Sequence, residues 1–353
     1  MAQARNAVVR SKAPLRISFC GGGTDVSPYP ETHGGCVLSC TIDKFAYVSV
    51  RQRSDDRIRV TSLDQKVDVE YHPSQPAGDG KLDLAHSIFR RFGSLSIDCF
   101  MQSNAPPGSG LGSSSTMIVA LIAAMARIGG LHFSAYEMAE LAYKVEREDL
   151  RIVGGMQDQY AAAFGGFNFI EFTKDGVVVN PLRISDDALN ELHYHLLLCY
   201  TGVTRLSSNI LKEQTDNVSA GKSEVMDSLA KMKELTVELK RALLLGRMSE
   251  FGDLLDQAWW LKKNLASAIS NTQIDDLYAV AKSNGALGGK ILGAGGGGYL
   301  LLFVPFTRRE RVAAAMEAAG GRVVDFQFDL SGVRTWSATD TTWVGHGLEV
   351  STS

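Results

Sequence analysis

Residues 104–116 constrain the fold more than any other stretch of this 353-residue chain. Gly108, Gly110 and Gly112 alternate with other residues, and four hydroxyl side chains follow before an apolar run over residues 117–125. This pattern predicts a glycine-rich loop that leads into a buried helix, with backbone amides open to close approach by a ligand. Because the first turn of a helix has unpaired N–H groups and partial positive charge, the loop suits a phosphate group. A serine N-cap after a flexible turn is the alternative that these residues alone leave open.

Two common nucleotide-binding patterns do not fit the chain. The P-loop requires a lysine after its glycines, and residues 104–116 contain none. A G-x-G-x-x-G pattern occurs at Gly293, Gly295 and Gly298, but a dinucleotide site must open a helix, whereas residues 299–304 predict a strand. The sequence therefore favours a phosphate-binding site of another type, with residues 293–298 as a second loop that a ligand approaches closely.

Composition narrows the class of protein. The content of 45% hydrophobic and 21% charged residues is ordinary for a soluble globular protein, and the length suits two domains. A net charge of -3 gives no electrostatic case for nucleic acid. The longest apolar run is too short for a bilayer and the N-terminus lacks a signal peptide, so we expect a cytoplasmic protein without membrane contact. The pairs Cys36 with Cys40 and His193 with His195 supply too few ligands for zinc.

The order of predicted elements suggests two domains. Strands dominate up to residue 103, and a capping-box pattern at Ser134 and Glu137 predicts a helix over residues 135–149. Residues 193–200 predict a strand, and helices then alternate with short strands. We expect an N-terminal domain over 1–188, a C-terminal domain over 189–338 and a polar arm over 339–353.

Two groups of polar residues could carry chemistry. Arg16 and Asp25 bracket a glycine turn, which could bring both side chains to the edge of a cleft or could be an ordinary surface turn. Glu146 and Asp158 lie on either side of the pair Gly154 and Gly155. Carboxylates near a phosphate loop can hold Mg²⁺ and accept a proton from a hydroxyl group. Taken alone, Glu146 could equally be an exposed helical charge.

Three motifs, in this order, resemble those of the GHMP small-molecule kinases. They are residues 13–25, residues 106–115 and residues 290–298, which together extend over nearly the whole chain. The resemblance implies an α+β fold of two domains. The N-terminal domain would contain a left-handed βαβ crossover, the C-terminal domain would be ferredoxin-like, and the active site would lie between them.

Within this family, the chain resembles the branch that phosphorylates heptose 7-phosphates. The resemblance lies in residues 16–25, 41–44, 154–160, 269–276 and 285–290. It implies transfer of the γ-phosphoryl group of ATP to the anomeric hydroxyl of D-glycero-D-manno-heptose 7-phosphate, in the formation of activated heptose for surface glycans. The alternatives are a kinase of a free sugar such as L-fucose and a non-catalytic sensor of ATP and sugar. The resemblance leaves both a monomer and a homodimer open.

The resemblance also assigns roles to single residues. Asp158 matches the catalytic base, Arg16 the arginine that offsets charge at the reacting hydroxyl, and Ser114 with Glu146 the Mg²⁺ ligands. ATP binding falls on Pro107, Gly108, Ser109, Gly110, Leu111, Gly112, Ser113, Ser114 and Ser115. We expect sugar contacts from Gly22, Gly23, Thr24, Asp25, Gly155, Asp158, Gly295 and Gly296. The sugar's own phosphate needs a cationic pocket, for which Lys44, Arg205, Lys262 and Lys263 are the candidates, each of which could instead be surface charge.

Overall fold

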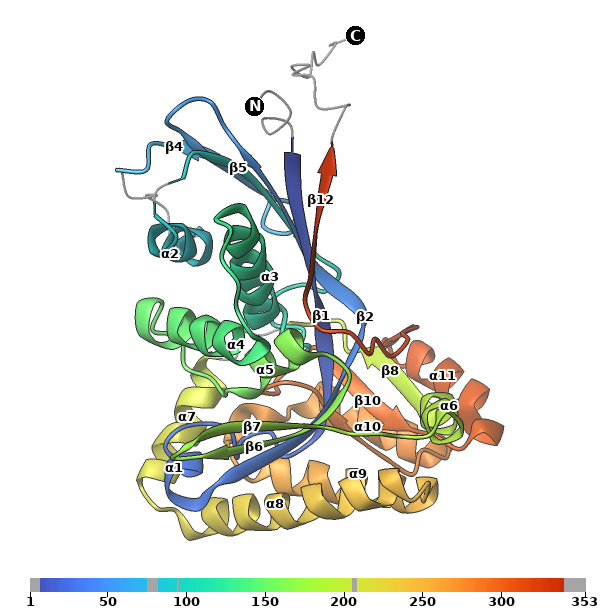
Figure 1. The fold of residues 1–353 in the computed structure, drawn as a ribbon. Helices are drawn as coiled ribbons and strands as arrows, with labels where there is room; N and C mark the ends of the chain where they lie inside the picture. The colour runs from blue at the N-terminus through green and yellow to red at the C-terminus, as the bar shows by residue number, and fades with distance from the viewer. Residues whose placement is uncertain (1–6, 75–81, 94, 205–207, 340–353) are drawn as a thin grey trace.

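Two β-sheets and the helices packed on them make up the fold. The computed structural model describes residues 7–74, 82–93, 95–204 and 208–339. One sheet contains eight strands and the other four, and most strand pairs are antiparallel. Figure 1 shows the long strands β1 and β2 and the shorter strand β12 standing upright, with the second sheet and its helices below them. The predicted α+β class is confirmed.

The larger sheet has the strand order β12-β1-β2-β5-β3-β4, with β6 paired to β2 and β7 paired to β6. Its only parallel pair among the described strands joins β3 and β5, so a crossover connects them. The strand bounds are β1 (Ala7–Cys20), β2 (Gly35–Gln52), β3 (Ile58–Ser62), β4 (Val67–Tyr71), β5 (Ile97–Ser103), β6 (Phe167–Thr173), β7 (Gly176–Pro181) and β12 (Arg334–Thr339).

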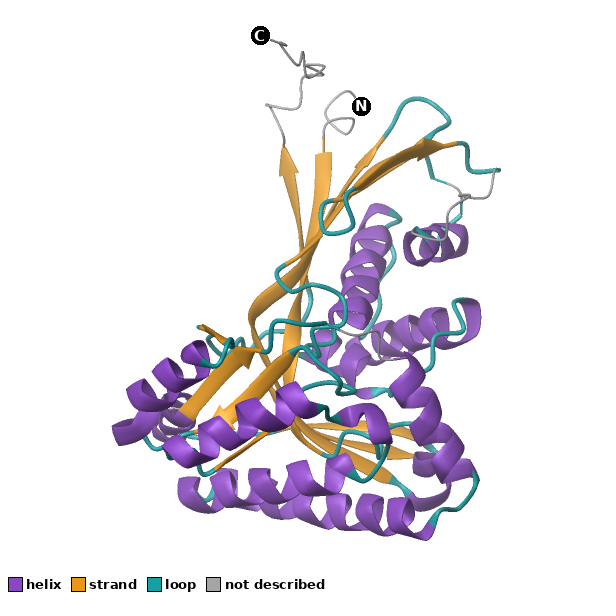
Figure 2. Ribbon diagram, turned by 180° about the vertical axis from the view of Figure 1, so that it is seen from behind, coloured by secondary structure: helices purple, strands orange, loops and turns teal. Residues whose placement is uncertain are grey.

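The helix predicted after the glycine loop is α3 (Ser113–Ile128), and it lies at the centre of the N-terminal core. Most of its side chains are buried, since it packs on β1 and β2 while other helices cover it. Figures 1 and 2 show these helices on one side of the upright strands. They are α2 (Asp83–Arg91), α4 (Ala135–Lys144) and α5 (Gln157–Phe164).

The smaller sheet has the order β11-β8-β10-β9, and all its pairs are antiparallel. Its strands are β8 (Leu196–Tyr200), β9 (Gly288–Ile291), β10 (Tyr299–Phe303) and β11 (Arg322–Val324). In chain order this arrangement is 4-1-3-2, with helices between the first and second strands and between the third and fourth. That is the split βαβ topology of a ferredoxin-like domain, as predicted.

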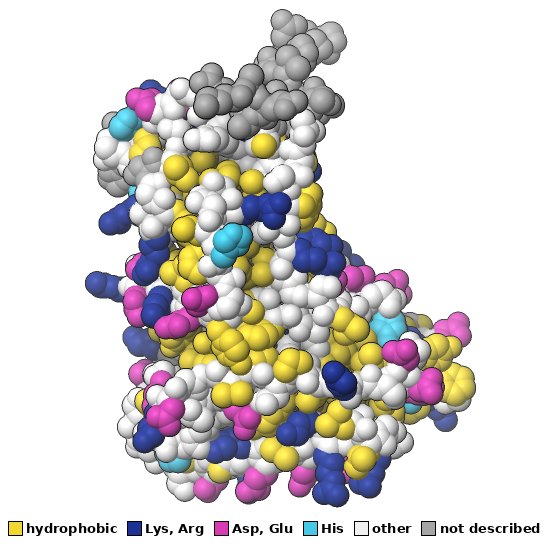
Figure 3. All heavy atoms as spheres, viewed as in Figure 1, with side chains coloured by type: hydrophobic (Ala, Val, Ile, Leu, Met, Phe, Trp, Pro, Cys, Tyr) yellow, Lys and Arg dark blue, Asp and Glu magenta, His cyan; other side chains and the backbone are white. Residues whose placement is uncertain are grey.

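The helices of the C-terminal half cover the smaller sheet and the lower part of the larger one. The longer helices are α6 (Asp186–His195), α7 (Ser208–Ser219), α8 (Ser223–Leu244), α9 (Met248–Lys263), α10 (Thr272–Asn284) and α11 (Arg309–Ala318). The short ones are α1 (Tyr29–His33), η2 (Val145–Asp149), η3 (Ser267–Ile269) and η4 (Phe306–Arg308). Over α8 and α9, Figure 3 shows basic and acidic side chains interspersed. Within the described part of the chain, no helix combines the length and apolar character needed to cross a membrane.

The strand predicted over residues 193–200 is wrong in its first half. Helix α6 continues to His195, and β8 begins only at Leu196. The Ser185 side chain accepts a hydrogen bond from the Ala188 amide, and two aspartates occupy the first helical turn. Both features favour a helix start. His193 and His195 therefore lie on a helix and do not share a strand face.

The last described strand returns to the N-terminal sheet. β12 pairs antiparallel with β1, with Arg10 opposite Trp336. The expected C-terminal domain over 189–338 therefore supplies a strand to the sheet of the other half. The predicted arm begins at the last residue of β12, and residues 340–353 lie outside the described residues.

One apolar cluster joins the two sheets. It contains Phe19 of β1, Phe251 of α9 and Phe303 of β10, all of which are fully buried. The rings of Phe19 and Phe251 meet edge to face at 5.5 Å between centroids. Because close-packed interiors resist displacement, this shared core fixes the two halves relative to each other and fixes the cleft between them.

Replacing Leu121 of α3 tests the central place of this helix. Leu121 is fully buried, so Leu121→Ala is expected to lower the free energy of unfolding by about 3 kcal/mol. The matched control is Leu131→Ala, because the Leu131 side chain is 50% exposed and should cost less than about 0.5 kcal/mol. Urea unfolding followed by circular dichroism measures both changes, and equal losses would contradict a core organised around α3.

Candidate active site

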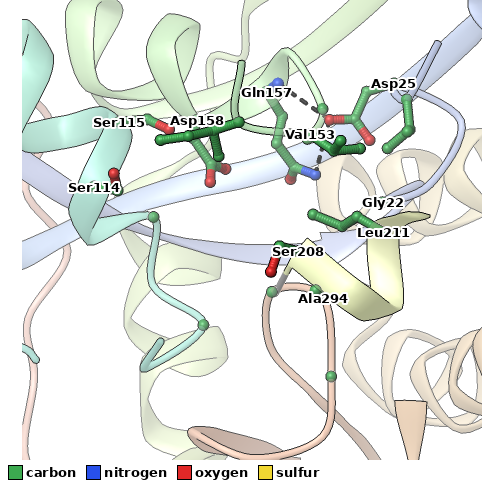
Figure 4. Close-up of a pocket in the computed structure, with 18 of the residues that line it drawn as sticks. Gly22, Asp25, Ser114, Ser115, Val153, Gln157, Asp158, Ser208, Leu211 and Ala294 are labelled. Carbon is green, nitrogen blue, oxygen red and sulfur yellow. Dashed lines mark hydrogen bonds between the residues drawn. The ribbon is translucent and has the colours of Figure 1, made fainter. Parts of the chain in front are cut away.

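A cavity of about 370 Å³ lies where the two halves meet. The residues that line it come from the turn after β1, the glycine loop before α3, the segment from η2 to α5, the start of α7, the end of α9 and the loop between β9 and β10. Figure 4 shows Ser114, Ser115 and Asp158 at one side of the cavity, and Ser208 and Ala294 across from them. The three sequence motifs, which are far apart along the chain, therefore meet in one place.

The glycine loop has the geometry that its sequence predicts. Gly108, Gly110 and Gly112 have φ angles of +75°, +84° and +77°, a region that favours glycine. Gly112 is the N-cap of α3, so the loop ends at the start of the helix. The Ser114 side chain is exposed in the first turn and faces the cavity, where the amides can receive an anion.

The second glycine loop packs directly against the first. A Cβ atom on Gly110 would lie 2.5 Å from the Leu292 carbonyl oxygen, and one on Gly293 would lie 2.5 Å from the Gly110 Cα. A Cβ atom on Gly298 would lie 2.2 Å from the Ser109 carbonyl oxygen. The sequence predicted that a ligand would approach the backbone of this loop closely. At Gly293 and Gly298 it is the backbone of the first glycine loop that approaches closely.

Arg16 and Asp158 form an ion pair beside the glycine loop. The Arg16 Nε and Nη2 atoms lie 2.8 Å and 2.7 Å from Asp158 Oδ1, and Nη1 donates to the Gly110 carbonyl at 2.5 Å. Arg16 is 3% exposed, which strengthens these charge-assisted bonds. Asp158 lies in the first turn of α5, where a negative charge is favourable. The guanidinium group thereby holds the carboxylate at a fixed place next to the loop.

Asp25 is bonded to the chain's own donors. Its carboxylate accepts hydrogen bonds from the Gly23 amide at 2.9 Å and from the amide and Nε2 of Gln157, both at 3.1 Å; Figure 4 shows the Gln157 contacts. Burial raises the pKa of Asp25, and the nearby charge of Asp158 raises it further, while the amide bonds act in the opposite direction. A Cβ atom on Gly155 would lie 2.0 Å from Asp25, which explains a glycine there. Asp25 thus positions the segment that leads into α5.

Glu146 lies in the π-helical turn η2, which follows α4 directly and completes the helix predicted over residues 135–149. The predicted capping box of Ser134 and Glu137 at its start is confirmed. The Glu146 Oε2 atom accepts hydrogen bonds from Ser115 Oγ at 2.7 Å and from Gln159 Nε2 at 2.6 Å. Single π-turns of this kind occur frequently at functional sites because they redirect a side chain.

Ser114 and Glu146 offer oxygen ligands to the same cavity, one exposed and one 3% exposed. Such hard oxygen donors suit Mg²⁺, which is usually held by one or two protein ligands together with substrate phosphates. In the described ranges there is no cluster of three or more His, Cys, Asp or Glu side chains that could hold a metal on its own. The donor set therefore fits a magnesium ion that arrives with a nucleotide.

Most of the other predicted residues also line the cavity. These are Gly22, Gly23, Pro107, Ser113, Ser115, Gly155 and Gly295. Lys262, one of four candidates for the phosphate of the sugar, lines it as well, and its Nζ donates to the Gly293 carbonyl. Burial, followed by the charge of Arg16, lowers the pKa of Lys262 to about 8.

Several predicted residues are not brought to the cavity. The Thr24 hydroxyl is buried between the Gly21 and Cys36 carbonyls, and Leu111 is part of the apolar core. The Ser109 carbonyl instead accepts the amide of Tyr299. Lys44 does not line the cavity, and its Nζ donates to the Asp325 carbonyl at 3.0 Å. Gly296 is likewise not in the lining, and Lys263 pairs with Asp275 at 2.7 Å. Arg205 lies outside the described residues.

Sequence reasoning missed three positioning residues, one of which is Gln159, the donor to Glu146. Arg147 donates to the carbonyls of Ile152 and Gly155 at 2.8 Å and 2.6 Å, and so holds the segment before α5. Gln157 connects that segment to Asp25. A Cβ atom on Gly154 would lie 2.4 Å from the Arg147 guanidinium group. The pair Gly154 and Gly155 was therefore the sequence feature that could have indicated a side chain packed closely against this segment.

Comparison with known proteins agrees with the fold. The family model described as GHMP kinases N terminal domain matches residues 82–166, and the one described as GHMP kinases C terminal matches residues 239–322. A Campylobacter jejuni protein named D-glycero-alpha-D-manno-heptose 7-phosphate kinase is 38% identical over 93% of this chain and 98% of its own length. The chain belongs to the GHMP kinase family and is an ATP-dependent phosphotransferase.

Two further relatives place the chain within that family. A crystal structure described as a D-glycero-D-manno-heptose 1-phosphate kinase from Bacteroides thetaiotaomicron superimposes with a TM-score of 0.79 and 35% identity, over 93% of this chain and 98% of that one. A Bacteroides fragilis protein named L-fucokinase/L-fucose-1-P guanylyltransferase is 27% identical over 84% of this chain but only 34% of its own length. The similarity to the heptose kinases is therefore higher and extends over whole chains.

Replacing Gly110 tests the contact between the two glycine loops. Gly110→Ala would place a methyl group against the Leu292 carbonyl, so the loops must separate, and we expect kcat/KM for ATP to fall about 100-fold through misplacement of the phosphates. Gly130→Ala is the matched control, because Gly130 also has a positive φ but nothing lies within 4 Å of its added Cβ. Both variants should lose about 1–2 kcal/mol of stability from backbone strain. Similar activity in the two variants would show that the loop contact is dispensable.

Proposed function

We propose that the protein transfers the γ-phosphoryl group of ATP to the anomeric hydroxyl of D-glycero-D-manno-heptose 7-phosphate, forming the 1,7-bisphosphate. The observation that carries the proposal is the Asp158 carboxylate, held by Arg16 beside the glycine loop that opens α3. This arrangement supports an acceptor hydroxyl and a nucleotide phosphate meeting at one point. Similarity over the full length of the heptose 7-phosphate kinase of C. jejuni supports the choice of sugar.

The proposed transfer forms one bond to phosphorus, breaks another and gives the proton of the acceptor hydroxyl to a carboxylate of the protein. The acceptor oxygen forms a bond to the γ-phosphorus, and the bond from that phosphorus to the bridging oxygen breaks, with its electron pair leaving on ADP. The acceptor proton passes to Asp158 Oδ2, since Oδ1 already accepts both Arg16 donors. Because phosphoryl transfer depends mainly on positioning and charge neutralisation, the fixed orientation of this carboxylate contributes as much as its basicity.

The glycine loop supplies the nucleotide site in this proposal. The amides from Gly108 to Ser114 would hold the triphosphate at the positive end of α3. Ser114 and Glu146 would hold Mg²⁺, which when bound neutralises charge on the phosphate oxygens. Ser115 and Gln159 keep the Glu146 carboxylate in place through their hydrogen bonds to Oε2.

One heptose kinase relative is named for a 7-phosphate and the other for a 1-phosphate. The first experiment should therefore identify which sugar accepts the phosphoryl group. ADP release with ATP and Mg²⁺ should be compared for the heptose 7-phosphate, the heptose 1-phosphate, the unphosphorylated heptose, L-fucose, mannose and galactose. We expect turnover with the 7-phosphate only. Preference for a free sugar would replace the proposed substrate, and ATP binding without turnover on any acceptor would indicate a sensor.

Replacing Asp158 tests its role as proton acceptor. Asp158→Asn keeps the size of the side chain but removes the basic carboxylate, so kcat should fall by about 100-fold or more while ATP affinity is retained. Single-turnover kinetics and nucleotide titration measure the two quantities separately. The control is Asp275→Asn, since Asp275 pairs with Lys263 outside the cavity and should leave kcat unchanged. Turnover of the Asp158 variant near that of the wild type would contradict the assignment.

A further inference from the structure

We propose that Lys262 is a further catalytic residue of this site, and that its ammonium group contacts the phosphoryl group during transfer. The proposal rests on the kinase function proposed above and adds a residue from the C-terminal half to those of the N-terminal half. It also separates Lys262 from the role of binding the distal phosphate of the sugar, for which the sequence made it one of several candidates.

The position of Lys262 is the first argument. It lies in the last turn of α9, is 5% exposed and lines the cavity. Its Nζ donates to the Gly293 carbonyl, and Gly293 packs against Gly110. Arg16 donates to the carbonyl of that same Gly110. Two cations, one from each half, therefore flank the contact between the glycine loops, at the place where the nucleotide phosphates and the acceptor must meet.

The hydrogen bonds of the cavity cations are the second argument. Arg16 donates to Asp158 and Gly110, and Arg147 donates to two carbonyls of the segment before α5. An ammonium group has three donors, and Lys262 has one recorded acceptor, Gly293. Among the described residues, no carboxylate lies within 4.0 Å of its Nζ. Arg16 pairs with Asp158, and Arg147 Nη1 lies 3.6 Å from Glu146 Oε2. Of the three described cations that line the cavity, Lys262 is thus the one without a carboxylate partner, and it has donors left for phosphate oxygens.

The charge environment is the third argument. Burial and then the charge of Arg16 disfavour the protonated form of Lys262, whereas the carboxylates of Asp25 and Asp158 favour it. The second buried lysine, Lys290, also lies close enough to interact, and burial lowers its pKa well below the usual value. A buried charge without a carboxylate partner costs folding free energy, and perturbed groups of this kind cluster at functional sites. An anion whose charge spreads over equatorial oxygens during transfer supplies the missing partner.

Lys262→Met tests the contact, with Lys263→Met as its matched control. The control removes the neighbouring lysine of the same helix, which pairs with Asp275 outside the cavity. Both variants are assayed for ADP release with whichever acceptor gives the wild-type protein its highest turnover. We expect Lys262→Met to lower kcat by about 100-fold or more, with both KM values changed less than about threefold, as for loss of a transition-state donor. The control should keep wild-type kcat.

The outcomes separate this proposal from the proposed function. An active wild type with unchanged kcat in Lys262→Met overturns the role of Lys262 alone. A raised KM for the phosphorylated acceptor, with kcat retained, also overturns it, because Lys262 would then bind the phosphate of the substrate. A wild-type protein that transfers phosphate to no acceptor overturns both proposals.

Stability distinguishes a catalytic from a structural role. The pKa of Lys262 is lowered on folding, so its protonated form destabilises the native state below about pH 8, and this cost disappears as pH rises through the unfolded value. Lys262→Met should therefore have an equal or higher Tm than the wild type at pH 7. A large loss of Tm with proportional loss of activity would indicate a structural residue.

The pH profile of the wild type tests the proposal without any variant. ADP release, quenched and quantified directly, should give a kcat/KM that falls about tenfold per pH unit above about pH 8, as Lys262 loses its proton. Both phosphorylated substrates are fully ionised in that range. A profile that stays flat from pH 7 to about pH 9.5 would contradict the proposal, as would a falling limb that persists unchanged in Lys262→Gln.

Discussion

The contact between two glycine loops is the constraint on which the rest of the site depends. Gly110 belongs to the half that carries α3, and Gly293 belongs to the half that carries the smaller sheet. Their backbones approach so closely that a single Cβ atom on either would collide with the other loop. Each loop therefore sets the position of the other, and the anion-binding end of α3 faces the C-terminal half at a fixed distance.

The polar side chains of the cavity fall into two groups. Some bond to one another and hold the shape of the cavity, and others remain able to bind a ligand. Arg16 pairs with Asp158, and Arg147 bonds to two nearby carbonyls and lies 3.6 Å from the Glu146 carboxylate, so these contacts hold the geometry of the cavity. Ser114 and Lys262 can still form bonds to the phosphate groups of a nucleotide or to its metal ion. Because a buried charge without a counter-ion is costly, the buried Lys262 ammonium group suits a site that an anionic ligand completes.

The parts of the site that sequence reasoning predicted are those with local signals. The apolar run after Gly112 dictates a buried helix, and the alternating glycines dictate its entry loop. The failures concern long-range contacts. Nothing near Lys44 in sequence indicates that its ammonium group bonds to Asp325, and nothing near Gly293 indicates that its neighbour is another loop. For His193, the capping signal at Ser185 was present but was outweighed by the apolar run that follows the histidine.

The return of β12 to the first sheet restricts how the cleft can open. The chain crosses between the halves twice, before α6 and again before β12. The segment that makes the second crossing is bonded to the larger sheet, because Gln327 and Asp329 exchange hydrogen bonds with Thr41 and Asp43 of β2. Two crossings, one of them fastened, do not form a single hinge. A rotation of one half against the other would therefore have to bend both crossings at once, including the one that is bonded to β2.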